Sequence, residues 1–159
     1  MNYLKGNKLK LESIIKHDTV IHSVGFNPTE YQLSLDFDWI IKTDIQSGIY
    51  EYHLSPSTLI FENVWDFQLN LESNLSLTID EFKILSKSKP KNIDYLCNVQ
   101  HEYLVLLDCF EGAIQFRTIG GKLFKRKPCY INMNTSLSIK DRGGFSLLPN
   151  GEEFDVIVG

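Results

Sequence analysis

The residues of this chain that could do chemistry occur as short pairs of polar side chains. Asp36 and Asp38 are separated by one residue, so on a strand both carboxylates lie on one face, about 7 Å apart. Two carboxylates at about that distance can hydrolyse a glycosidic bond. Glu51 and His53 have the same spacing and could transfer a proton. Polar residues at alternate positions are also typical of the wet face of a half-exposed strand, and we interpret both pairs in that way.

Basic side chains gather in the second half of the chain. The stretch Lys122–Lys127 holds four cations around Phe124, a composition that could bind phosphate or single-stranded nucleic acid. We interpret it instead as a solvated hairpin end or an edge strand that lysines protect from aggregation, since one six-residue patch supports few phosphate contacts. The sequence Asp141-Arg142-Gly143-Gly144 indicates a tight turn with open backbone amides, beside which an anion could sit. The candidate binding residues are Trp65, Lys125, Arg126 and Arg142.

No pattern for a nucleophile, a metal or a nucleotide is present. There is no Gly-x-Ser-x-Gly motif, and the paired glycines lack the strand before and helix after that a nucleotide loop needs. His17 and His22 are five residues apart, which puts them on one face of neither a helix nor a strand. The cysteines at 97, 109 and 129 lack the close spacing of zinc ligands. We therefore predict no catalytic residue, no metal and no cofactor.

Length and composition bound the class of protein. The chain has 159 residues, of which 43% are hydrophobic, which fits one domain over residues 1–159 with its own core. A net charge of −4 argues against a nucleic-acid binder. The start, Met1–Lys5, is not followed by the apolar run of a secretory signal, and no stretch is long enough to span a bilayer. We expect a cytoplasmic protein with reduced thiols and no membrane contact.

Apolar residues at every second position predict strands. Alternation is clearest over 31–41 and 65–71. Gln46-Ser47-Gly48 predicts a hairpin turn into 49–54 with Gly48 at positive φ, and Phe110-Glu111-Gly112 predicts a turn between 102–109 and 113–119. Weaker strand signals cover 19–25, 58–61, 79–86, 129–133, 144–147 and 154–158, and loops are expected at 27–29, 55–57, 86–93 and 120–121.

Short strands joined by short links predict a mainly β fold with antiparallel pairing. Two architectures fit, an antiparallel β-sandwich and a closed barrel-like sheet. One short helix packed at an end is also compatible, with Lys8–Lys16 as a strand or two helical turns.

Several short phrases occur in the same order through the middle and end of the chain. They are Ser55–Asp66, Ala113–Arg117 leading to Gly120, Arg126–Pro128 and Asp141–Ser146. Together these phrases resemble a family of uncharacterised small bacterial proteins over about residues 37–147. Ser57 and Asp141 stand where that family has alanine and glutamate. The resemblance implies a bacterial, soluble protein and no catalytic residue.

These observations leave three functional hypotheses. The first is a non-enzymatic protein that binds a protein partner or its own copies through a sheet face or edge, as in immunity to a toxin or regulation of a neighbouring protein. The alternative is a small-ligand or phosphate-binding β domain that uses a barrel mouth with Lys125, Arg126 and Arg142. The third is a hydrolase built on Asp36, Asp38 or Glu51 with His53.

Overall fold

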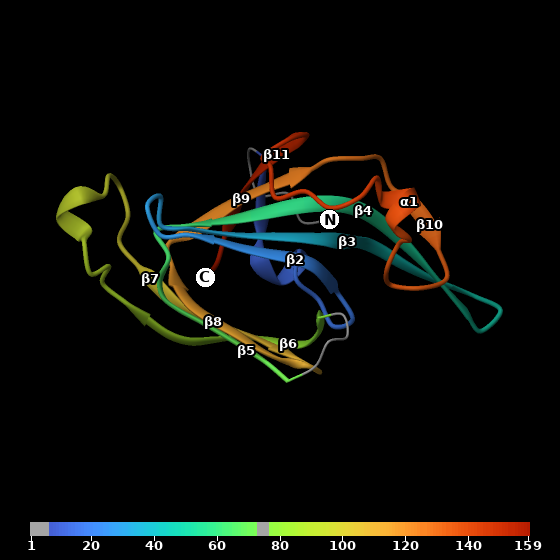
Figure 1. Cartoon of the computed structure of the whole chain (residues 1–159), viewed down its shortest axis with the longest axis horizontal. Helices are drawn as coiled ribbons and strands as arrows, with labels where there is room; N and C mark the ends of the chain where they lie inside the picture. Colours follow the sequence, from blue (N-terminus) through green and yellow to red (C-terminus); the bar gives the residue numbers. More distant parts are fainter. Residues whose placement is uncertain (1–6, 73–76) are drawn as a thin grey trace.

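The computed structural model describes residues 7–72 and 77–159, and it is mainly β. Eleven strands form one continuous sheet that folds over, so that its two halves face each other (Figure 1). In sheet order the first half contains β1 (Lys8–Lys10), β11 (Glu152–Ile157), β9 (Gly120–Lys125), β4 (Ile49–Glu62), β3 (Gln32–Gln46) and β2 (Val20–Asn27). The second half contains β6 (Leu77–Ser88), β7 (Glu102–Cys109), β8 (Gly112–Thr118) and β5 (Trp65–Leu71), and β10 (Tyr130–Asn132) pairs with β4 off this path.

The two halves are joined at one place, where β2 pairs with β6 through Val20 and Ile21. The outer edges of the sheet, β1 and β5, are not paired with each other, so the sheet is open. Neighbouring strands are antiparallel except β1 and β11, which are parallel. The prediction of a mainly β, chiefly antiparallel fold is confirmed, and of the two architectures the closed sheet is not the one that forms.

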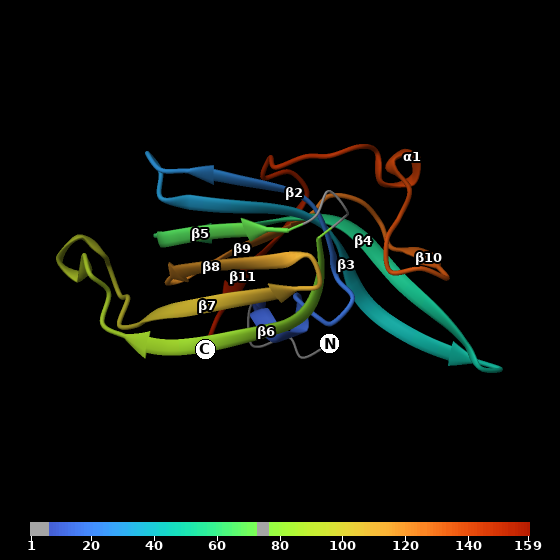
Figure 2. The same ribbon diagram turned by 60° about the horizontal axis from the view of Figure 1, so that its bottom comes forward.

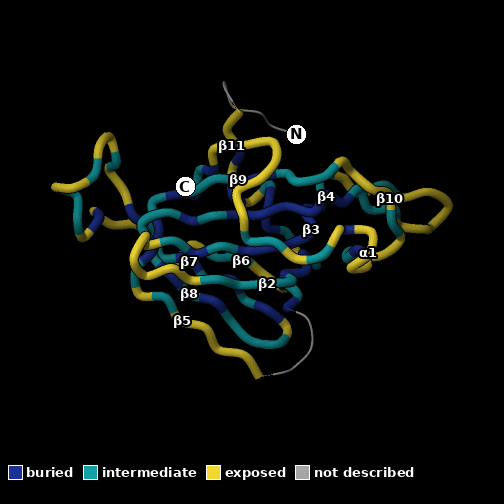
Figure 3. Tube along the Cα trace, turned by 45° about the horizontal axis from the view of Figure 1, so that its top comes forward, coloured by how far each residue is buried: buried dark blue, intermediate teal, exposed yellow. Residues whose placement is uncertain are grey.

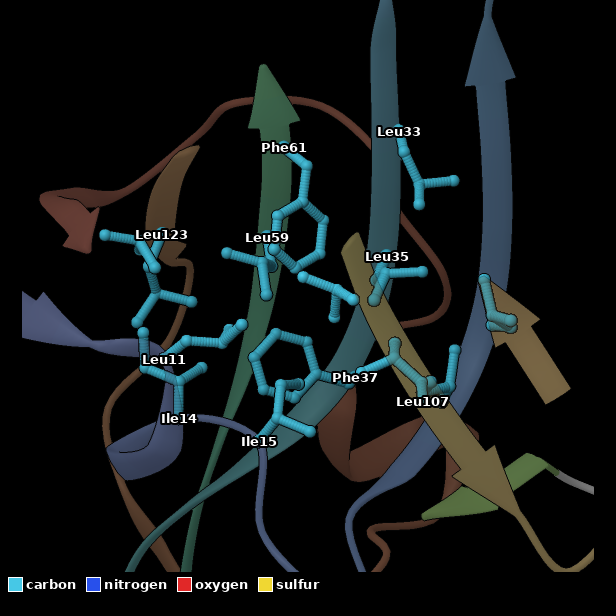
Figure 4. Close-up of a cluster of buried hydrophobic side chains, with 14 of the residues drawn as sticks. Leu11, Ile14, Ile15, Leu33, Leu35, Phe37, Leu59, Phe61, Leu107 and Leu123 are labelled. Carbon is cyan, nitrogen blue, oxygen red and sulfur yellow. The ribbon is translucent and has the colours of Figure 1, made fainter. Parts of the chain in front are cut away.

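The hydrophobic core lies between the two halves. β3 contributes Leu33, Leu35 and Phe37, all fully buried, from alternate positions. The facing half contributes its own alternate residues, and the rings of Phe61 and Phe116 meet with centroids 4.6 Å apart. Figure 4 shows Leu11, Ile14 and Ile15 at one end of this cluster. Burial of these alternating side chains is what sets the inner face of each strand.

The hairpin of β3 and β4 is longer than its sequence pattern predicts. The alternation predicted a strand over 31–41, whereas β3 continues to Gln46 and turns back through Ser47 and Gly48, with φ values of 50° and 77°. The predicted positive φ at Gly48 is confirmed. The far part of this hairpin extends beyond the folded sheet together with β10 (Figure 2).

Three local predictions are wrong. Residues 55–57 lie inside β4, because Pro56 needs only its carbonyl there, which accepts from the Arg126 N–H at 3.0 Å. Residues 120–121 begin β9 instead of forming a loop. Residues 144–147 form no strand.

The one short helix that the sequence allows is present, but at the other end of the chain from the start, and the predicted strand at Lys8–Lys16 forms only in part. The short helix α1 (Ile139–Arg142) lies near the end of the chain, and Lys8–Lys16 forms β1 and a 3-10 turn at Leu11–Ser13. A second 3-10 turn spans Ile93–Tyr95. No helix among the described residues is long and apolar enough to cross a membrane. Residues Met1–Lys5, on which the expectation of no secretory signal depends, lie outside the described residues.

Gly121 provides a test of the packing between β4 and β9. A Cβ at Gly121 would lie 2.3 Å from the carbonyl oxygen of Ile60, so any side chain there would force the two strands apart. We predict that Gly121→Ala lowers the free energy of unfolding by about 1–3 kcal/mol, the usual cost of overpacking, measured by urea denaturation. Gly48→Asn is the control, since its site is open and Asn tolerates positive φ. An equal, small effect of both substitutions would contradict the close approach.

Candidate functional site

Asp36 and Asp38 lie on the outer face of β3, and that face is covered. Leu35 and Phe37 between and beside them point into the core. Residues 136–148, which we call the covering segment, lie across the carboxylates and include α1. Both aspartates have 0% exposure (Figure 3 shows the buried parts of the chain). The prediction that they occupy a wet face is therefore wrong, because a later segment of the chain replaces water there.

Arg142 on α1 joins the two carboxylates. Its Nη2 donates to Asp36 Oδ1 at 2.7 Å and its Nη1 to Asp36 Oδ2 at 2.9 Å, a bidentate pair. Its Nε donates to Asp38 Oδ1 at 3.1 Å. Only 1% of Arg142 is exposed. Burial alone would lower the pKa of Arg142, but the hydrogen bonds and negative charges of Asp36 and Asp38 outweigh it and raise that pKa.

Arg126, just after β9, is a second cation on Asp36. Its Nη2 donates to Asp36 Oδ1 and its Nη1 donates to the carbonyl of Ser146 at 3.2 Å. The Nε of Arg126 is buried and has no partner among the described residues. Burial lowers the pKa of Arg126, and the nearby charge of Arg142 lowers it further, against the opposing attraction of Asp36.

The other hydrogen-bond partners of Asp38 come from β2 and from the covering segment. Its Oδ2 accepts from the backbone N–H of Leu137 at 2.9 Å and lies 2.9 Å from Nε2 of His22. Burial would raise the pKa of Asp38, but the hydrogen bonds from His22 and Leu137 and the charge of Arg142 lower it below its ordinary value. Ser136 Oγ also approaches His22 Nε2, at 3.3 Å. A Ser-His-Asp triad needs serine and aspartate on different ring nitrogens, so this is not one.

We call Asp36, Asp38, Arg126, Arg142 and His22 the buried charge network. Every oxygen of its two carboxylates accepts at least one hydrogen bond from the protein itself. A carboxylate that serves as acid or base must instead reach a substrate proton. The arrangement supports anchoring of the covering segment and does not support hydrolysis by this pair.

The candidate binding residues fall in separate places. Arg126 and Arg142 converge on Asp36, as described. Lys125 lines a shallow pocket of about 400 Å³ with Arg126, Lys127 and Glu152, at the end of β9. Trp65 begins β5 in the other half of the sheet, where its ring lies 4.7 Å from that of Tyr31. The four residues therefore form no common site.

Trp65 belongs to a second set of polar groups, which includes Glu102, a residue that the sequence pattern did not single out. Trp65 pairs with Arg117 across β5 and β8, and Arg117 Nε donates to Asp66 at 2.9 Å. Glu102, at the start of β7, is 1% exposed. One carboxylate oxygen of Glu102 and the indole N–H of Trp65 are buried without a partner among the described residues. Burial raises the pKa of Glu102, only partly opposed by the charges of Arg117 and Lys91.

The predicted pair Glu51 and His53 lies on the projecting part of β4. His53 Nε2 lies 2.9 Å from the carboxylate of Asp44 on β3, so His53 makes its hydrogen bond to Asp44. Lys42 also contacts Asp44, at 3.2 Å. In the described part of the chain, no group of three His, Cys, Asp or Glu side chains is placed to hold a metal ion. The side chains of Lys42, Asp44, Glu51 and His53 lie together on one face of a projecting part of the sheet.

This projecting part is a three-stranded arm, made of residues 42–53 of the hairpin and β10. The register places Ile45 opposite Tyr50 and Thr43 opposite Tyr52, so these side chains share one face, which we call the apolar face. The rings of Tyr50 and Tyr52 stack with centroids 6.3 Å apart. Tyr130 of β10 lies on the same face, and the opposite face carries Lys42, Asp44, Glu51, His53 and Ile131.

Comparison with known proteins adds no family to this geometry. The chain matches no protein-family model, no curated protein and no solved structure at the significance required. The resemblance to small bacterial proteins therefore stays a prediction.

The buried charge network predicts a large effect of removing its central cation. Arg142→Met leaves Asp36 and Asp38 buried with less compensation, so we expect a loss of about 3–5 kcal/mol in the free energy of unfolding. Lys140→Met, an exposed cation on the same helix, is the matched control. The measurements are urea denaturation and limited proteolysis within residues 136–148. If Arg142→Met and Lys140→Met behave alike, the covering segment is not anchored by this network.

The burial of Glu102 predicts that removing its charge stabilises the folded chain, by an amount that depends on pH. Its pKa is raised in the folded chain, so its charged form opposes folding above that raised pKa and the penalty disappears below its ordinary pKa of about 4. Glu102→Gln should raise the melting temperature at pH 7, with the gain shrinking as the pH approaches 4. Exposed Glu30→Gln is the control. Equal gains at both pH values, or a loss at pH 7, would contradict the burial of a destabilising charge.

Proposed function

We propose that this chain is a cytoplasmic, non-enzymatic protein-binding module and that the three-stranded arm is its interaction surface. The observation that carries the proposal is the exposure of large apolar side chains on the arm. Ile45 is 62% exposed, Tyr50 51% and Tyr130 37%. Apolar side chains gathered on one projecting element are typical of an interface with another protein.

The composition of the arm supports a protein partner in particular. Aromatic residues are enriched where proteins meet, because a rigid ring buries much area at little entropic cost. The apolar face presents Tyr50 directly opposite Ile45, with Tyr52 and Tyr130 closer to the base of the arm. Its base is continuous with a small buried cluster of Ile40, Leu54 and Leu137, against which Tyr52 packs. A partner could therefore extend an apolar contact that the fold already begins. Immunity to a toxin and regulation of a neighbouring protein are roles of this class.

A second candidate function is the binding of a small ligand, which one pocket favours. A pocket of about 340 Å³ lies on the outer face of the β2, β3, β4 and β9 strands. It combines apolar side chains with polar ones, as small-molecule sites do. Arg126, Arg142 and Lys125 do not line it, so a ligand there would not use the cations that the sequence singled out. Its lining includes Ser34, Ile60, Glu62, Lys122, Phe124 and Leu147.

Site-specific photo-crosslinking tests the proposed interaction surface. A photoreactive side chain in place of Tyr50 should give a covalent adduct with a protein in extract of the source organism. The same group in place of Phe110 is the matched control, since Phe110 is 59% exposed but follows β7 in the other half of the sheet. We expect the adduct from position 50 to exceed that from position 110 at least tenfold.

The adduct should also depend on the rest of the apolar face. Adding Ile45→Ser should abolish it while the melting temperature changes little, because Ile45 is mostly exposed. Equal labelling from positions 50 and 110, or labelling that persists with Ile45→Ser, would refute the arm as the interaction surface.

A further inference from the structure

The arm has one backbone edge without a neighbour. β3 pairs with β4 along its length, but on its other side it pairs with β2 only over Gln32–Phe37. Just beyond, Lys16 Nζ donates to the carbonyl of Ile40 at 2.9 Å. From Lys42 to Gln46, no described strand lies on that side. An exposed edge of this kind is a template for another strand.

The turn of the hairpin determines which backbone groups face this edge. Ser47 and Gly48 form a two-residue turn with positive φ at both positions, and Gln46 and Ile49 close it. In such a hairpin the closing pair is hydrogen-bonded, and hydrogen-bonded pairs alternate along the strands. Asp44 and Glu51 are then the next hydrogen-bonded pair. The N–H and C=O groups of Thr43 and Ile45 consequently point outward, to the free edge.

We propose that the edge of a second copy of this chain occupies this edge, antiparallel to it, around a two-fold axis at Thr43. The proposal rests on the proposed function and names the partner of the arm. In this register Thr43 pairs with itself through its outward groups. Lys42 of each copy then lies directly opposite Asp44 of the other copy, in the non-hydrogen-bonded position where side chains approach most closely.

Charge complementarity selects this register over the neighbouring ones that the outward groups allow. An axis at Asp44 would also pair Thr43 with Ile45, but it would place the two Asp44 carboxylates face to face, which is destabilising. An axis at Ile45 would place Asp44 opposite Gln46, so it would form no ion pair between the copies. Around Thr43, the two lysines and two aspartates alternate in sign. In a monomer, Lys42 and Asp44 already touch at 3.2 Å, with 63% and 30% of their side chains exposed. Pairing extends this contact into a ring of four charges.

The resulting assembly joins two arms into one sheet. Its strand order would be β10, β4, β3 and then the same strands of the second copy in reverse. Because cross-strand neighbours share a face, the side chains of Ile45 and Tyr50 from both copies lie on one surface of this sheet. Such self-complementarity is what a two-fold interface requires, since the same patch must serve both copies.

A charge-swap experiment tests both the occupant and the register. The full chain should show a concentration-dependent dimer by sedimentation velocity. Lys42→Asp places an aspartate against Asp44 of the second copy, and Asp44→Lys places lysine against lysine, so each variant alone should weaken dimerisation at least tenfold. An equimolar mixture of the two variants restores opposite charges at both contacts and should form a heterodimer.

Thr43→Pro is a second, independent variant. Proline lacks an N–H, and the N–H of Thr43 points outward, so the hairpin should form while dimerisation is lost. Ile131→Ser, on the far edge of the arm, should leave the dimer intact. Melting temperatures identify any variant that fails to fold.

Several results would overturn the proposal. The first is a chain that stays monomeric at every concentration at which it is soluble. The second is a dimer that persists in the Thr43→Pro variant. The third is a single charge variant that dimerises as strongly as the mixture of the two. These results leave the photo-crosslinking outcome untouched. A monomer that still crosslinks another protein from position 50 refutes only the second copy as partner, whereas loss of both adduct and dimer refutes the arm as an interaction surface.

Discussion

The pair between Arg142 and Asp36 is the interaction on which the outer face of this fold depends. Two adjacent outward positions of β3 carry carboxylates, and burying them is costly unless cations and hydrogen-bond donors reach both. Arg142 donates two hydrogen bonds to Asp36 as a bidentate pair and a third hydrogen bond to Asp38. The covering segment has little regular structure of its own, since α1 is four residues long. Its position is therefore determined by where its arginine and backbone amides meet the aspartates.

Sequence pattern was sufficient for the inner face of the sheet and insufficient for the outer one. Alternation at Leu33, Leu35 and Phe37 predicts both the strand and its buried side, because apolar side chains have one favourable destination. The same alternation places Asp36 and Asp38 together but does not say what lies over them. Either water or a buried arginine can satisfy a carboxylate, and the local pattern is the same in both cases. The contact with Arg142 spans more than a hundred residues, and no local signal predicts it.

The misplaced elements have similar physical causes. Gly120 and Gly121 suggest a loop because glycine is common there, yet Gly121 lies where β4 leaves no room for a Cβ. Pro56 suggests a break, yet it lies in β4 where its missing N–H is not needed. In both cases a neighbouring segment overrides the local preference. It is β4 for Gly121 and the chain at the end of β9 for Pro56. Arg126 and Arg142, predicted from the sequence as binding residues, pair with acidic side chains inside the fold.

Leu137 connects the buried charge network to the arm. The hydrogen bond from Leu137 N–H to Asp38 starts the covering segment at a fixed point, and the side chain of Leu137 packs with Ile40 and Leu54 at the base of the arm. Tyr52 packs against the same cluster, and Tyr50 stacks beyond it. An isolated two-stranded hairpin is marginally stable in water, so the arm depends on the third strand β10 and on this packed base. The buried charges therefore do more than hold down a loop: they hold in place the packing from which the exposed apolar face of the arm extends.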